Sequence, residues 1–235
     1  SAAGYFFGVH APGRKGIDCF LAAAHHAALA QAHGARIIKA LHPDATVGTT
    51  FSCSHVEPFT NREKDIIAAK KADVLLNRLF IEPLLGMGYP TKEIRVLRRI
   101  EKYIKPNDEN NLKFDMDFIG IQNYTREIIR HSFFVPFLQA KIVTAKERKV
   151  EMTAMNWEVY PESMYHMLKK FQAYENIPPL IITENGAAFP DLPENERVHD
   201  PKRAQYMQDI LQQVLRAKNE GVNVNGYFVW TFLDN

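Results

Sequence analysis

The sequence predicts a parallel α/β fold. Four short apolar runs are rich in β-branched and aromatic residues and lack strict polar alternation, which indicates strands buried on both sides. The segments between them have helical periodicity, and strands that alternate with helices are typical of a parallel sheet. Residues 133–151 fit neither period, and we expect an irregular excursion above the sheet there. The predicted strands are residues 46–52, 117–123, 180–183 and 226–231.

The predicted helices carry recognisable start signals. Residues 18–41 are rich in alanine and contain no proline. Thr60 and Glu63 have the spacing of a capping box at the start of the second helix. Asp200 followed by Pro201 is typical of an N-cap with proline in the first turn. The residues expected to face the core are Ala68, Ala72, Leu75 and Leu79, then Met164, Leu168 and Phe171, and finally Ala204, Met207, Leu211 and Val214.

Composition limits the classes of partner. The 235 residues are 46% hydrophobic and 24% charged, as in one globular domain spanning 1–235. A net charge of +2 is too small to indicate nucleic acid or an anionic membrane as a partner. No apolar run is long enough to cross a bilayer, and no leader sequence is recognisable. Cys19 and Cys53 form neither a metal-spaced set nor a disulfide framework, which favours a cytoplasmic location.

Histidines gather in the first predicted helix. His26 and His33 are seven residues apart and could share a face, with His25 beside them. No carboxylate stands at the spacing of a zinc-protease motif. We therefore expect surface or packing histidines, and predict no metal ion and no other cofactor.

A carboxylate follows the third predicted strand directly. Residues 180–183 lead into Glu184, Asn185 and Gly186. In α/β barrels, reactive groups sit where strands end, because the rigid strand fixes the side chain. Glycine at 186 would let the chain turn away sharply. The alternative is a polar turn without catalytic function.

Residues 182–186, Ile-Thr-Glu-Asn-Gly, resemble the nucleophile signature of glycoside hydrolase family 1, the β-glucosidase family. Further resemblances to this family occur in the expected order along the chain. The resemblance implies a (β/α)8 barrel of which this chain is about the second half, with strands 5–8 and their helices. The further similar stretches are residues 4–13, 117–124 (Asp-Phe-Ile-Gly-Ile-Gln-Asn-Tyr), 156–161 (Asn-Trp-Glu-Val-Tyr-Pro) and 226–235.

The resemblance also implies roles for five residues. Glu184 is the nucleophile, and Tyr124 donates a hydrogen bond to it; the alternative for Tyr124 is core packing. Trp230 lies under the sugar in the cleavage subsite, unless it is a buried strand residue. Trp157 lines the mouth for the leaving group. Gln122 replaces an asparagine usual in the family, so its extra methylene alters the expected sugar contact.

A second carboxyl group about 5–5.5 Å from the nucleophile is needed as acid and base. In the family it belongs to a Thr-Phe-Asn-Glu-Pro motif, which the resemblance implies lies upstream of Ser1. A Phe-Glu-Trp motif is likewise expected after Asn235. Glu57 follows the first predicted strand, but a solvated surface glutamate is the favoured interpretation.

The resulting hypothesis is a retaining β-glycosidase that hydrolyses small β-glucosides or oligosaccharides through a covalent glycosyl-enzyme intermediate. The chain alone is expected to be inactive, and to pair with itself or with the complementary N-terminal half. Two alternatives stay open. One is a 6-phospho-β-glycosidase, although residues 233–235 resemble the non-phosphorylated branch. The other is a non-catalytic sugar-binding or structural half-barrel.

Overall fold

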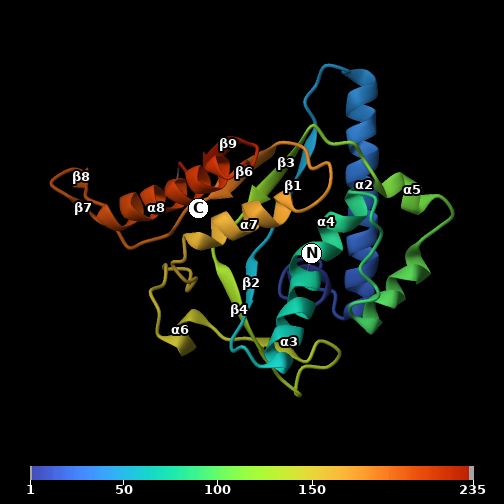
Figure 1. The fold of residues 1–235 in the computed structure, drawn as a ribbon, viewed down its shortest axis with the longest axis horizontal. Helices are drawn as coiled ribbons and strands as arrows, with labels where there is room; N and C mark the ends of the chain where they lie inside the picture. Colours follow the sequence, from blue (N-terminus) through green and yellow to red (C-terminus); the bar gives the residue numbers. More distant parts are fainter. Residues whose placement is uncertain (1, 233–235) are drawn as a thin grey trace.

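The computed structural model describes residues 2–232, and a four-stranded parallel sheet lies at its centre (Figure 1). The strand order is β1-β3-β6-β9, so strands that follow one another in the chain are neighbours in the sheet. All four predicted strands are confirmed, but β6 continues through Asn185 and β9 ends before Trp230. The strands are β1 (Gly48–Ser52), β3 (Phe118–Gln122), β6 (Leu180–Asn185) and β9 (Val224–Val229).

The main core lies between one face of this sheet and the helices. Ile119, Ile121 and Ile182 of the strands are fully buried against Leu168 and Phe171, as their apolar patterns predict. In Figure 1, α7 and α8 lie side by side over the sheet, and α2 stands beyond β1. The helices are α1 (Ala2–Tyr5), α2 (Ile17–Leu41), α3 (Glu63–Asp73), the π-helical turn η1 (Val74–Arg78), α4 (Leu79–Leu84), the 3₁₀ helix η2 (Arg95–Tyr103), α5 (Asp108–Leu112), α6 (Ala145–Arg148), α7 (Glu162–Gln172) and α8 (Pro201–Asn219).

The opposite face of the sheet is lined by small residues around Gly120. A methyl group added to Gly120 would meet Thr50 Oγ1 at 2.3 Å and the Thr183 side chain at 2.9 Å. Phe228 of β9 is 60% exposed. The prediction that every strand is buried on both sides is therefore wrong for β9 within residues 2–232. An apolar sequence does not show which face of a strand is packed against other elements.

The predicted capping box at Thr60 is wrong. Helix α3 begins at Glu63 with Arg62 as its N-cap residue. The Thr60 hydroxyl donates to Asp65 Oδ2 over 2.6 Å, and its oxygen accepts from the backbone N–H of Arg62 in place of that of Glu63. A complete capping box forms instead at Thr144, where α6 begins.

Helix α8 begins as predicted, but the face that it buries is rotated about the helix axis relative to the predicted one. The Asp200 side chain accepts a hydrogen bond from the backbone N–H of Arg203. Tyr206 and Ile210 are buried, whereas Leu211 is 46% exposed, so the predicted buried face is partly wrong. Residues 2–232 contain no helix with the length and apolar character needed to cross a membrane.

A second, smaller sheet extends the carboxyl ends of β1 and β3. Its order is β2-β4-β5, with β2 and β4 parallel and β4 and β5 antiparallel. The excursion 133–151 is thus not wholly irregular, since it holds β5 and α6, which are too short to show a period. The strands are β2 (His55–Pro58), β4 (Arg126–His131) and β5 (Ala140–Ile142), and a separate hairpin pairs β7 (Pro193–Glu194) with β8 (Arg197–Val198).

Candidate active site

Glu184 is held by donors on both of its carboxylate oxygens. It is the penultimate residue of β6 and lies opposite Gln122, the last residue of β3. Gln122 Nε2 donates to Oε1 over 2.6 Å, and the Tyr124 hydroxyl donates to Oε2 over 2.7 Å. Two donors from the neighbouring strand end fix the plane of the carboxylate. The structure therefore brings together three of the predicted site residues.

Tyr124 contacts both Glu184 and Trp157, the fourth of the predicted site residues. Burial, the hydrogen bond to Glu184 and the charge of that carboxylate all raise the pKa of Tyr124, so the phenol stays protonated near neutral pH and acts as a donor. Its ring packs against Trp157 with centroids 5.2 Å apart. Trp157 is 39% exposed, which leaves much of its surface for a ligand.

Two buried asparagines support the site, and the sequence analysis missed their roles. Asn185, fully buried, donates to the Asn123 carbonyl over 2.7 Å and accepts from the Tyr227 hydroxyl over 2.6 Å. Asn123 in turn donates to the Cys53 carbonyl over 3.0 Å and accepts from Ser163. This chain of hydrogen bonds ties the ends of β1, β3, β6 and β9 together. The only signal in the sequence was that each asparagine immediately adjoins a predicted site residue.

Trp230 reaches the site through the backbone that follows β9. Its N–H donates to the Asn185 carbonyl over 2.9 Å, and its side chain is 46% exposed. A Cβ atom on Gly186 would lie 2.0 Å from the Trp230 carbonyl oxygen. Glycine is therefore needed at 186 for the close approach of two chain segments. The alternative interpretation, a buried tryptophan in the last strand, disagrees with the position of Trp230 after β9 and with its exposure.

Glu57 of β2 and Glu158, which lies outside the named strands, are both engaged in ion pairs with Arg126. Glu57 accepts from His55 over 2.8 Å and from Arg126 over 3.0 Å, so it is a partner in a network and not a free surface group. Glu158 accepts from both Arg126 and Arg148. Burial raises the pKa of Glu158, but hydrogen bonds from these arginines outweigh it and lower the pKa to about 2. Glu158 therefore carries no proton to give to a leaving group near neutral pH.

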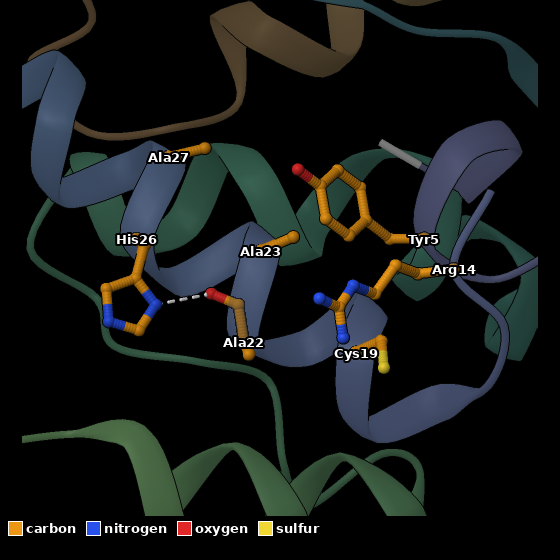
Figure 2. Close-up of a pocket in the computed structure, with 7 residues that line it drawn as sticks. All are labelled: Tyr5, Arg14, Cys19, Ala22, Ala23, His26 and Ala27. Carbon is orange, nitrogen blue, oxygen red and sulfur yellow. Dashed lines mark hydrogen bonds between the residues drawn. The ribbon is translucent and has the colours of Figure 1, made fainter. Parts of the chain in front are cut away.

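The histidines of α2 do not converge on a common point. His25 is buried, with its ring nitrogens 2.9 Å from the Tyr89 hydroxyl and 3.1 Å from Asp108 Oδ2. The ring of His26 turns to the Ala22 carbonyl of its own helix, 2.7 Å away (Figure 2). These contacts agree with packing and surface roles.

A cavity of about 560 Å³ opens on the outer side of α2 (Figure 2). Alanines of α2 form its floor, and an arginine, a tyrosine and a histidine supply polar groups. None of the predicted site residues lines this cavity, so it lies apart from the Glu184 cluster. The lining residues are Tyr5, Arg14, Cys19, Ala22, Ala23, His26 and Ala27.

Consecutive parallel strands that are neighbours in one sheet, with a carboxylate at a strand end, are the arrangement found in (β/α)8-barrel enzymes. The family model for glycosyl hydrolase family 1 matches residues 1–235, and the chain belongs to this family. It is 35% identical over 234 residues to Beta-glucosidase A of Thermotoga maritima, covering 99% of this chain and 52% of that protein.

Two solved structures are similar over the whole chain. The AHE enzyme from Alicyclobacillus herbarius gives a TM-score of 0.93 at 32% identity, covering 100% of this chain and 52% of that one. A Thermotoga maritima family 1 glycoside hydrolase, complexed with a cyclophellitol analogue transition state mimic, gives 0.90 at 34% identity with the same coverage. The chain thus spans about half the length of the relatives it matches. Its fold is the second half of a (β/α)8 barrel, in which β1, β3, β6 and β9 are strands 5–8.

Proposed function

We propose that this chain carries the nucleophile half of a retaining β-glycosidase that hydrolyses terminal β-D-glucosides. The observation that carries the proposal is the carboxylate of Glu184, held at the end of β6 by Gln122 and Tyr124 at 2.6 and 2.7 Å. Such a carboxylate is held in one orientation at the edge of the sheet where barrel enzymes bind their substrates.

The mechanism follows from this geometry. Glu184 attacks the anomeric carbon while a general acid protonates the departing oxygen, so that a glycosyl ester forms with inversion. Water, activated by the same acid group in its basic form, then displaces Glu184 and inverts the centre again. Tyr124 keeps its proton throughout and stabilises the Glu184 carboxylate before attack and as it leaves.

Aromatic side chains supply the sugar platform. We assign Trp230 to the sugar in the cleavage subsite and Trp157 to the leaving group, because an exposed indole face suits the C–H side of a pyranose. Gln122 contributes an amide edge beside Glu184. The relatives named β-glucosidase and the relative that binds a cyclophellitol analogue support small β-glucosides or oligosaccharides as ligands.

The general acid is proposed to come from outside these 235 residues. Glu57 and Glu158 are held in ion pairs with Arg126, and the matched relatives are about twice as long as this chain. The isolated chain should therefore fail to hydrolyse p-nitrophenyl β-glucoside and should gain activity when mixed with the complementary barrel half. Strong turnover by the chain alone would contradict this part of the proposal.

Covalent trapping tests the nucleophile. The natural full-length protein, incubated with a 2-deoxy-2-fluoro glucoside, should accumulate one adduct per chain, which peptide mapping places on Glu184. Glu184→Gln should lose about 10³-fold or more in turnover, whereas Glu147→Gln, at an exposed cap of α6, should not. A label on another residue would overturn the assignment.

The same experiment separates the alternatives. A 6-phospho-β-glycosidase would react only with the 6-phosphorylated fluoro glycoside, and a non-catalytic sugar-binding half-barrel would give no adduct. Residues 233–235, which were expected to distinguish the phosphorylated branch, lie outside the described residues.

A further inference from the structure

Three side chains with metal-binding atoms converge beside the second sheet. His55 and Glu57 are two residues apart on β2, so their side chains point to the same face of the strand. His166 comes from α7, and the ligand atoms of all three lie within 4.8 Å of one another. The imidazole rings of His55 and His166 are nearly parallel, with centroids 4.3 Å apart.

We propose that His55, Glu57 and His166 form a binding site for a divalent transition metal, with zinc as the preferred ion. Two imidazoles and one carboxylate are a donor set that zinc favours. Zinc holds such ligands at about 2.0–2.2 Å, so their atoms lie about 3.4 Å apart in a tetrahedron. The present separations lie on both sides of this value, since His55 Nε2 and Glu57 Oε1 are 2.8 Å apart and the three ligand atoms lie within 4.8 Å of one another. The site goes beyond the proposed function, since none of the three belongs to the Glu184 cluster.

The cluster is open to solvent on part of its surface. The side chains of His55 and Glu57 are 21% and 30% exposed, which leaves room for water as a fourth ligand.

The charges around the cluster are balanced. Arg126 binds Oε2 of Glu57 at 3.0 Å, which leaves Oε1 directed to His55. Arg126 is also paired with Glu158, and Lys170, one helical turn beyond His166, is paired with Asp73. Lys170 therefore has its own carboxylate, and Arg126 shares Glu158 with Arg148. Oε1 of Glu57 supplies the negatively charged ligand atom for a divalent ion.

Calorimetric titration of the natural full-length protein, after dialysis against a chelator, tests the site. Zn²⁺ should bind at one ion per chain, and the denaturation temperature should rise with Zn²⁺ concentration because the ion binds the folded state. Co²⁺ should give the visible absorption of a tetrahedral site. His166→Ala and Glu57→Gln should each weaken Zn²⁺ affinity by about tenfold or more.

The matched control is His26→Ala, because His26 is an exposed histidine that bonds only its own helix in Figure 2. This variant should bind Zn²⁺ like the parent protein. Circular dichroism of the metal-free variants checks folding, and His166→Gln replaces His166→Ala if the alanine variant unfolds. Unchanged affinity in the His166 and Glu57 variants, equal loss in His26→Ala, or no Zn²⁺ binding by the parent protein would each overturn the proposal.

Discussion

Tyr124 donates its hydroxyl hydrogen to Oε2 of Glu184 over 2.7 Å, from the end of one strand to the end of the next. The chain offers a matched pair elsewhere, because Tyr165 of α7 donates to Oε2 of Glu220 over the same 2.7 Å. Both pairs join a phenol to a carboxylate. Only the Tyr124–Glu184 pair lies in the candidate active site. Comparing the loss of the hydroxyl in the two pairs therefore separates a catalytic effect from a structural one.

If the proposed glycosidase activity is assayed in the natural full-length protein, Tyr124→Phe should lower turnover by about 10- to 150-fold while the protein stays folded. The variant loses one hydrogen bond to a charged group, worth about 1.5–3 kcal/mol. Steady-state kinetics and thermal denaturation measure the two effects. Tyr165→Phe should leave turnover unchanged, and an equal loss in both variants would show that Tyr124 acts only through packing.

The buried ion-pair network predicts an acid-sensitive contribution to stability. Glu158 has a pKa of about 2 in the folded protein, below its ordinary value of 4.5. Its contribution is therefore complete above about pH 4.5 and is lost as the pH falls toward 2. At pH 7, Glu158→Gln should lower the free energy of unfolding by about 3 kcal/mol, because Arg126 and Arg148 lose their shared partner.

Urea denaturation at several pH values checks this prediction. The gap between the parent protein and Glu158→Gln should narrow steadily below pH 4.5. Glu101→Gln, at an exposed position of η2, should track the parent protein throughout. A gap that stays constant down to pH 2 would mean that the Glu158 carboxylate does not titrate with folding.

The fold was largely predictable because strand and helix periods are carried by many residues at once. The prediction was weaker where a single residue determines the start or end of a helix or strand. Thr60 and Thr144 show the same capping-box spacing, yet of the two only Thr144 forms the box, since α3 begins at Glu63 and Thr60 lies before its N-cap residue. The exact end of β9 depends on its pairing with β6, which places Trp230 just outside the strand.

The site was only partly predictable. Glu184, Gln122 and Tyr124 adjoin two strand ends, so their meeting follows from parallel neighbours. The support from Asn185 and Tyr227 was not predictable, because their contact joins residues 42 positions apart and has no spacing signature. Such buried polar contacts become visible only when the strands are placed side by side.

Asn185→Ala should lower the free energy of unfolding by about 3 kcal/mol or more. It would leave the Tyr227 hydroxyl and the Asn123 carbonyl without their buried partner, at about 1–3 kcal/mol each. Urea denaturation of the variant measures the loss. Asn225→Ala, at an exposed position of β9, serves as the control and should change stability by less than about 0.5 kcal/mol. Equal stability of the two variants would show that the Asn185 contacts contribute little.

Gly186→Ala should reduce catalysis by displacing the segment that carries Trp230. The new Cβ atom would lie 2.0 Å from the Trp230 carbonyl oxygen, so one of the two backbones must move. A displacement of about 1 Å at a substrate-binding residue can cost about 10²-fold in rate. We expect kcat/KM for glucosides to fall by about that factor, with a loss of about 1–3 kcal/mol in stability from the overpacking.

Gly34→Ala is the matched control, because Gly34 lies inside α2 and no atom would meet its Cβ within 4 Å. That variant should be more stable by about 0.5–1 kcal/mol, since alanine loses less entropy in a helix, and should keep full activity. If Gly186→Ala keeps the kcat/KM of the parent enzyme, then the approach of Trp230 to Gly186 does not position the sugar platform.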